Sequence, residues 1–126
     1  MCLARLQRFK KQRYGYKIFK KHAGFLYGEY TGRRQSRPTG VWLDAVKYRY
    51  DTSVFELKTR ACENYYNGWH VYAHHADAIA IMNWHDKVHT YNLVIRKVAI
   101  KHIMATGYQG SRLNKTHVIV CRKIKI

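Results

Sequence analysis

The segment GWHVYAHHADAIAIMNW, residues 68–84, decides the fold class because it changes from a strand pattern to a helix pattern within a few residues. The glycine-led apolar run at 68–72 is typical of a short strand. The part that follows has helical composition, and its expected buried stripe consists of Ala76, Ile79, Ala80 and Met82 or Asn83. We therefore predict one main helix around residues 74–84, directly after a strand.

Strand patterns dominate on both sides of this segment. Residues 14–30 alternate aromatic and polar positions around His22-Ala23-Gly24, which predicts a hairpin, and residues 41–50 are a further strand candidate. Residues 116–126 carry apolar side chains on one face and predict a buried or half-buried strand.

The apolar stretch 88–104 is too long for one straight strand, so we expect a bend near Lys97 or Lys101, or two strands. A turn is expected at 107–110. The predicted fold is α+β, a single compact domain with a mostly antiparallel curled sheet and one main helix.

Length and composition fit one domain without disulfides. The chain has 126 residues, 47% of them hydrophobic, and three cysteines without CxxC spacing. Residues 1–13 are expected to form a basic N-terminal arm or a short helix, and residues 14–126 the domain. No apolar run approaches the roughly 20 residues that a membrane span requires. We expect a cytoplasmic protein.

Charge is strongly segregated along the chain. Residues 1–40 hold eleven Lys and Arg against Glu29 alone, and residues 89–126 hold eight with no acid. Residues 41–88 have five bases and six acids, and the sum is the net charge of +17. Such an imbalance predicts an anionic partner, with nucleic acid or a ribonucleoprotein first and an acidic protein surface as the alternative.

The candidate nucleic-acid-binding residues are cations of the terminal regions, including an arginine-rich loop at 31–40, and tyrosines interleaved with them. Arginine suits phosphate because its planar fork can bind two oxygens, and tyrosine can stack on bases. The set is Lys10, Lys11, Arg13, Tyr14, Tyr16, Lys17, Lys20, Lys21, Arg33, Arg34, Arg37, Arg112 and Lys115. No motif for sequence-specific reading is present, so we expect backbone-dominated binding.

The sequence gives weaker support for a catalytic site or a metal site. No carboxylate pair has diagnostic spacing, and Cys62 with His70 is a conceivable nucleophile and base without further support. Five histidines lie between His70 and His89, but their spacing puts two rings on one face only if both segments are helical. We predict no metal, no cofactor and no enzymatic activity.

Several short motifs carry a resemblance. GYKIF at 15–19, GWHVY at 68–72, ATGY at 105–108 and VIVCRKI at 118–124 resemble small, uncharacterised proteins of phages and prokaryotic mobile elements. That resemblance implies a phage-type protein acting in the host cytoplasm. It also implies a role such as inhibition of host defence, in the manner of an anti-CRISPR protein that occupies nucleic-acid contacts.

A more distant likeness supports a second hypothesis. The Gly-aromatic-His strand followed by an alanine-rich helix is similar to part of an ADP-ribosyltransferase-like fold, although residues 89–126 lack the late-strand glutamate of such enzymes. This likeness implies a nucleotide-binding or degenerate transferase-like protein. Tyr16, His70 and Tyr72 would then line a nucleotide pocket.

Overall fold

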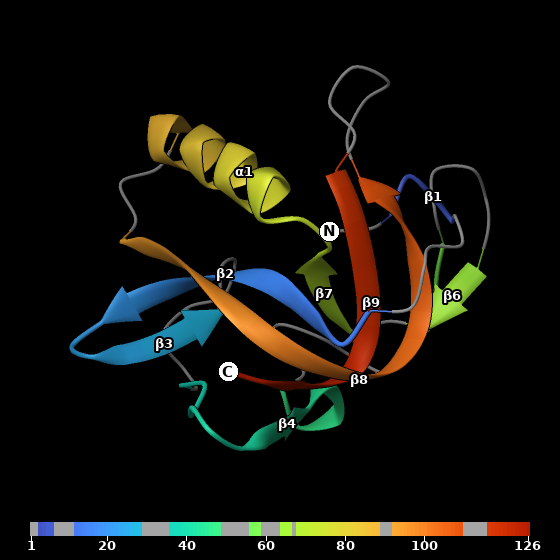
Figure 1. Ribbon diagram of the computed structural model, residues 1–126, viewed down its shortest axis with the longest axis horizontal. Coiled ribbons are helices and arrows are strands. Elements are labelled where there is room, and N and C mark those ends of the chain that lie inside the picture. Colours follow the sequence, from blue (N-terminus) through green and yellow to red (C-terminus); the bar gives the residue numbers. More distant parts are fainter. Residues whose placement is uncertain are drawn as a thin grey trace.

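A strongly curled antiparallel sheet with one helix makes up the protein in the computed structural model (Figure 1). The structure describes residues 3–6, 12–28, 36–48, 56–58, 64–66, 68–88, 92–109 and 116–126. The strands are β1 (Arg5–Leu6), β2 (Tyr14–His22), β3 (Phe25–Gly28), β4 (Trp42–Asp44), β5 (Glu56–Lys58), β6 (Asn64–Tyr66), β7 (Trp69–Tyr72), β8 (Leu93–Gln109) and β9 (Thr116–Lys125). The helices are α1 (His75–Val88) and a 3-10 turn, η1 (Ala45–Lys47).

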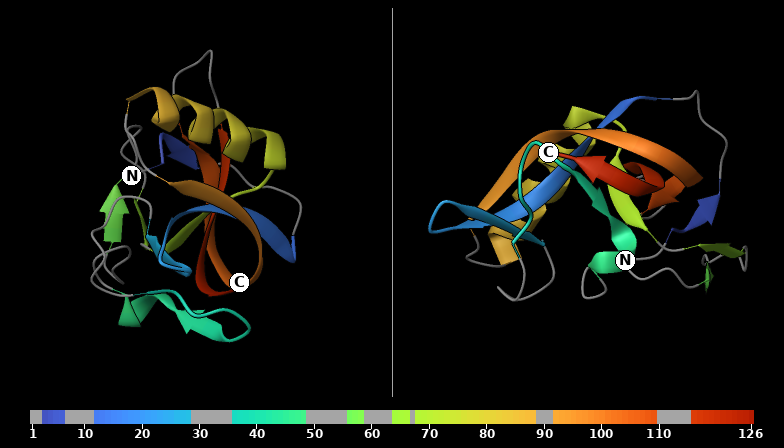
Figure 2. Two further views of the ribbon diagram at one scale, coloured as in Figure 1. Left: turned by 90° about the vertical axis from the view of Figure 1, so that its left-hand side faces the viewer. Right: turned by 90° about the horizontal axis from the view of Figure 1, so that it is seen from below.

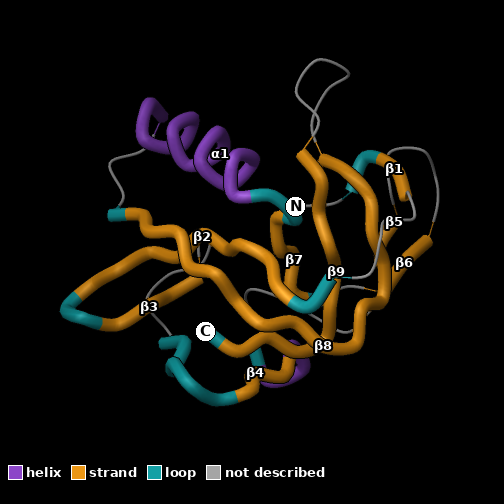
Figure 3. Tube along the Cα trace, in the orientation of Figure 1, coloured by secondary structure: helices purple, strands orange, loops and turns teal. Residues whose placement is uncertain are grey.

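The main sheet closes on itself. Its strand order is β1-β8-β2-β7-β9-β4, and β8 also pairs with β9. The strands β8, β2, β7 and β9 therefore form a closed ring, with β1, β3 and β4 added at its margins (Figure 3). The β2–β7 pairing is the narrowest join of this ring, with Tyr16 opposite Tyr72 as its aligned pair. β5 and β6 form a separate two-stranded sheet.

The long strand β8 can serve two partners because it bends. Its first part pairs with β2 from Leu93 to Ala99, and its second part pairs with β9 from Ala99 to Gln109. His102 has a φ of 56°, and the register shifts between Ile103 and Ala105. The bend predicted near Lys97 or Lys101 is thus present within one continuous strand. The prediction of a turn at 107–110 is wrong for residues 107–109, because these residues still belong to β8.

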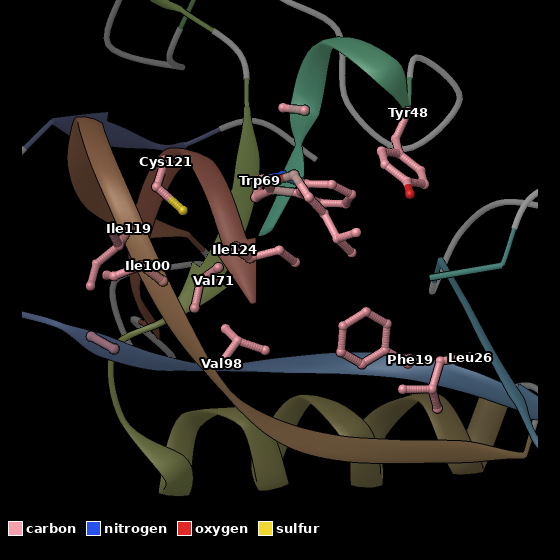
Figure 4. Packing of buried hydrophobic residues seen from close by; sticks show 13 residues of the cluster. Phe19, Leu26, Tyr48, Trp69, Val71, Val98, Ile100, Ile119, Cys121 and Ile124 are labelled. Carbon is pink, nitrogen blue, oxygen red and sulfur yellow. The ribbon is translucent and has the colours of Figure 1, made fainter. Parts of the chain in front are cut away.

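Side chains pack on both faces of the curled sheet. The inner face encloses a cluster centred on Trp69 (Figure 4). This inner cluster contains Phe19, Leu26, Leu43, Ala45, Tyr48, Trp69, Val71, Ala73, Val98, Ile100, Ile119, Cys121 and Ile124. A second cluster lies between the outer face and α1, and it contains Leu3, Ile18, Tyr72, Ala78, Val118 and Val120.

The helix covers only part of the outer face. α1 lies on one side of the curled sheet and β4 on the opposite side (Figure 2). Ile81 and Met82 of α1 pack with Ile95 of β8 against the outer cluster. The Asp77 carboxylate accepts a hydrogen bond of 3.2 Å from the backbone N–H of His117, which ties the first turn of α1 to β9. The helix predicted around 74–84 is confirmed, and it extends to Val88.

Three further expectations can be compared with the structure. The prediction of a mostly antiparallel curled sheet with one helix is confirmed, although strands outweigh the helix more than the α+β label implies. Residues 3–6 form neither a helix nor a detached arm, because Leu3 is fully buried and β1 pairs with β8. The strand predicted at 41–50 is cut short, since the Asp44 side chain accepts a hydrogen bond from Val46 N–H and starts η1.

Candidate nucleic-acid interface

Lysines of β8 and β9 gather on the outer face of the sheet. Val98, Ile100 and Ile124 point into the inner cluster. Because successive side chains of a strand point to opposite faces, the lysines directly before or after these residues point outwards. Lys97 and Lys101 come from β8 and are exposed, and Lys123 and Lys125 come from β9 and are half-buried.

Two aromatic side chains lie on the same face, in one row across four strands. Tyr14 of β2 is opposite Ala99 of β8, Ala99 is opposite Lys125 of β9, and Lys125 is opposite Trp42 of β4. Residues directly opposite in an antiparallel pair share a face, so the whole row points outwards. We call the surface formed by Tyr14, Trp42, Lys97, Lys101, Lys123 and Lys125 the basic face.

Each of the two aromatic rings of the basic face has at least one lysine ammonium group close to it. Lys101 Nζ lies 4.0 Å from the centroid of the Trp42 ring, and Lys125 Nζ lies 5.2 Å from it. Lys97 Nζ lies 4.8 Å from the Tyr14 ring. Exposed cation–π contacts contribute only about 0.5–1 kcal/mol each. The contacts between the lysines and the rings are therefore weak. A lysine can leave its ring to contact an anionic partner that it binds more strongly.

Little negative charge opposes these lysines. Asp44, opposite Lys123, is the carboxylate that the described side chains place at this face. Its Oδ1 lies 3.5 Å from Nε of Arg122 and also accepts the hydrogen bond from Val46 N–H. The Asp44 carboxylate thus already has partners, and four lysines face one acid. The face is therefore positive, and the surface ion pair itself contributes only about 0–1 kcal/mol to stability.

Two predicted phosphate ligands lie in the interior instead. Lys17 and Arg37 are only 6% and 4% exposed. Lys17 Nζ donates a hydrogen bond of 3.2 Å to the carbonyl oxygen of His70 and lies 5.6 Å from the Trp69 ring. The Arg37 guanidinium lies 4.7 Å from the Tyr48 ring and 5.7 Å from the Trp69 ring. The expectation that Lys17 and Arg37 are surface phosphate ligands is wrong, because both side chains support the inner cluster.

Trp69 is the centre of this internal arrangement. Its indole Nε1 donates a hydrogen bond of 3.0 Å to the carbonyl oxygen of Leu43, and its ring lies 5.3 Å from that of Tyr48 (Figure 4). Lys17 is inside because it shares the inward side of β2 with Gly15 and Phe19. Burial of two cations beside aromatic rings explains why these basic residues are not available at the surface.

The other predicted residues are placed as follows. Arg13 is exposed next to Tyr14, which is itself 53% exposed. Tyr16 is half-buried, with its ring 5.0 Å from that of His75. Lys20 and Lys21 lie near the tip of the β2–β3 hairpin, about 20 Å along the strand from Tyr14. The remaining predicted residues, Lys10, Lys11, Arg33, Arg34, Arg112 and Lys115, lie outside the described residues.

Sequence reasoning missed most of the basic face. Trp42 and the four lysines of β8 and β9 were absent from the predicted set, which relied on runs of adjacent cations. A pattern that could have found them is present in the sequence. Lysine recurs at every second position in 97–101, interrupted at Ala99, and again at 123–125, between apolar residues. Such alternation places the lysines on one face of a strand.

Other chemistry lacks a site among the described side chains. No group of three His, Cys, Asp or Glu residues within them could hold a metal ion. Cys121 is buried, and burial raises the pKa of its thiol to about 12 although the nearby Lys17 lowers it in part. A thiol held neutral in this way is a poor nucleophile. Cys62, His85 and His89 are not among the described side chains.

A nucleotide pocket was predicted around Tyr16, His70 and Tyr72, and the structure gives the packing and hydrogen-bond contacts of these side chains. Tyr72 is buried in the cluster beneath α1, and Tyr16 packs against that cluster. His70 is half-buried, with Nδ1 at 3.1 Å from the carbonyl oxygen of Gly68. These three side chains therefore serve packing and local hydrogen bonding.

Comparisons with known proteins give no relative from which the fold or the basic face could be interpreted. The chain matches no protein-family model, no curated protein and no solved structure. Within the part of the chain that the structure describes, no helix has the length and apolar character needed to cross a membrane.

Proposed function

We propose that this protein binds nucleic acid through the basic face and acts without catalysis. The observation that carries the proposal is the gathering of four lysines and two aromatic rings on one outer face, where the one described carboxylate is already paired. A polyanion that contacts these lysines releases its condensed counterions, which favours association. In a chain with a net charge of +17, binding also relieves self-repulsion.

The arrangement of the two basic regions of the sequence supports this function. Tyr14 and Arg13 come from the first region, and the four lysines come from the last. The pairing of β2 with β8 brings them together at Tyr14 and Ala99. A phage-type origin and interference with a host ribonucleoprotein, such as a CRISPR complex, extend the proposal and stay predictions.

Paired double variants test the basic face against net charge alone. Lys101→Ala/Lys123→Ala removes two cations of the face, and Lys20→Ala/Lys21→Ala removes two cations near the hairpin tip. Both changes lower the net charge from +17 by the same amount. Affinity for labelled single-stranded RNA, single-stranded DNA and duplex DNA would be measured by fluorescence anisotropy across about 50–200 mM salt.

The expected result is specific to the face. Each lost phosphate contact flattens the salt dependence by about 0.9 on duplex DNA and about 0.7 on single strands. Lys101→Ala/Lys123→Ala should therefore lower the slope by about 1.4 on single strands, and the hairpin variant should change it little. Equal losses in the two variants would mean that net charge alone drives binding. Binding to none of the three polymers would point to an acidic protein partner instead.

A further inference from the structure

The row of residues that crosses the basic face specifies the form of nucleic acid. We infer that the face takes a single strand whose backbone crosses β2, β8, β9 and β4, with one base stacked on Tyr14 and another on Trp42. This inference rests on the proposed function and names its substrate class. It is carried by the register of the four strands and by the lysines that now cover the two rings.

The spacing of the two rings suits a strand that runs across the sheet. Tyr14 and Trp42 occupy the two ends of the row, and Ala99 and Lys125 lie between them. Neighbouring strands are about 4.8 Å apart, so three steps place the two positions about 14 Å apart along the sheet. Ala99 has the smallest side chain of the row, so no large side chain protrudes from the sheet at this position between the two rings. A single strand can therefore follow the row without meeting a bulky side chain at Ala99.

The relative strengths of the contacts favour a base over a lysine on each ring. An exposed cation–π contact changes an equilibrium constant by about two- to fivefold. Stacking of a base on an aromatic side chain changes it by about five- to 150-fold. A base that displaces Lys101 from Trp42, or Lys97 from Tyr14, therefore gains more than it costs. The displaced ammonium groups then lie beside the phosphates that flank the stacked base.

A duplex cannot use the rings in this way. Its bases are already paired and stacked within the helix, so it offers the face only phosphates. Single strands recognised by sheet surfaces present unstacked bases to aromatic side chains. The basic face should accordingly bind a base-bearing single strand about tenfold or more tightly than a duplex of the same length at the same salt concentration.

The decisive experiment separates bases from phosphates. The 126-residue chain would be titrated with single-stranded DNA of about 16 nucleotides, with the same strand lacking its bases, with duplex DNA and with RNA of equal length. The variants are Tyr14→Leu and Trp42→Leu, singly and together. Phe25→Leu is the matched control, because Phe25 is an exposed aromatic of the hairpin, 58% accessible and distant from the row. Thermal unfolding checks that each variant is folded.

We expect the aromatic variants to lose affinity only for base-bearing single strands. Each aromatic variant should weaken their binding by about five- to tenfold and leave the duplex and the abasic strand within about twofold. Phe25→Leu should change neither. Equal affinity of the wild-type protein for abasic and base-bearing strands would overturn the inference while leaving the lysine dependence of the proposed function intact. If Lys101→Ala/Lys123→Ala also has no specific effect, the proposed function fails as well. The RNA and DNA arms identify which single strand is preferred.

Discussion

The narrow join between β2 and β7 predicts a large effect of the smallest substitution, Gly15→Ala. A methyl group at Gly15 would overlap Cγ1 of Val71 and lie 3.1 Å from the carbonyl oxygen of Tyr72. Val71 is fully buried, so its side chain has no free space to enter. Gly15 is needed here because β7 approaches closely. It does not have a left-handed backbone conformation.

The magnitude follows from the packing and from the pairing. Forcing a methyl group into a packed core costs about 1–3 kcal/mol. A shift of β7 would also weaken the pairing of Tyr16 with Tyr72, and each hydrogen bond lost there costs about 1 kcal/mol. We expect the free energy of unfolding to fall by about 2–4 kcal/mol, a large share of the roughly 5–15 kcal/mol of a typical domain. The same substitution at a strand position with free space would raise stability by about 0.4–1 kcal/mol.

A double-mutant cycle measured by urea unfolding tests this reasoning. Val71→Ala removes the atom that the new methyl group would overlap, so the double variant should be about 1–2 kcal/mol more stable than the sum of the single effects predicts. Gly24→Ala is the control, because its added methyl group meets nothing within 4 Å. Its cost comes from a φ of +80°, and Val71→Ala should not reduce that cost. Additive effects of Gly15→Ala and Val71→Ala within about 0.5 kcal/mol would refute the close-approach argument.

Two further predictions concern stability and reactivity. Ala23, in the hairpin turn, has a φ of 50°, which costs a non-glycine residue about 1–2 kcal/mol, so Ala23→Gly should raise the midpoint of thermal unfolding by a few degrees; an unchanged or lower midpoint would contradict this. Cys121 should not react with a thiol reagent at pH 8 in a Cys2→Ser/Cys62→Ser variant until urea unfolds the chain, and labelling of the native protein would show that the thiol is accessible. Because the pKa of the folded thiol is raised from 9.0 to about 12, its contribution to stability is complete below pH 9 and is lost as the pH rises through 12.

Local patterns predicted the parts of the fold that depend on neighbours in sequence. The hairpin at 14–28 follows from alternation around Ala23-Gly24, and the helix follows from its composition. The predicted buried stripe of the helix is wrong in register, because Ala76, Ile79 and Ala80 are exposed and the fully buried residue is Ala78. The closure of the sheet was not predictable in this way, because it depends on pairing of β2 with β7 and of β7 with β9 across long stretches of chain. Asp44 ended β4 early through a local hydrogen bond that strand propensity does not include.

The sequence predicted the chemical character of the candidate site better than it predicted the residues that form the site. A cationic surface with aromatic side chains was expected, and Tyr14 belongs to it. Lys17 and Arg37 were misplaced because a basic residue beside core positions looks the same in sequence as a basic residue at the surface. Only the contacts of their cationic groups with Trp69 distinguish the two cases. Lys101 and Lys125 were overlooked since their importance comes from a register shared with Trp42.

The position of β9 in the ring has a consequence for biosynthesis. β9 pairs with β7, β8 and β4, and it is the last of these strands to be translated. The apolar inner faces of β2, β7 and β8 therefore stay unsealed on the nascent chain until residues 116–125 have left the ribosome. Contacts between distant segments also form slowly. During this interval the positive charge of the part already translated keeps incomplete chains apart, so Lys97 and Lys101, which suit a polyanion in the folded protein, also oppose aggregation before the ring closes.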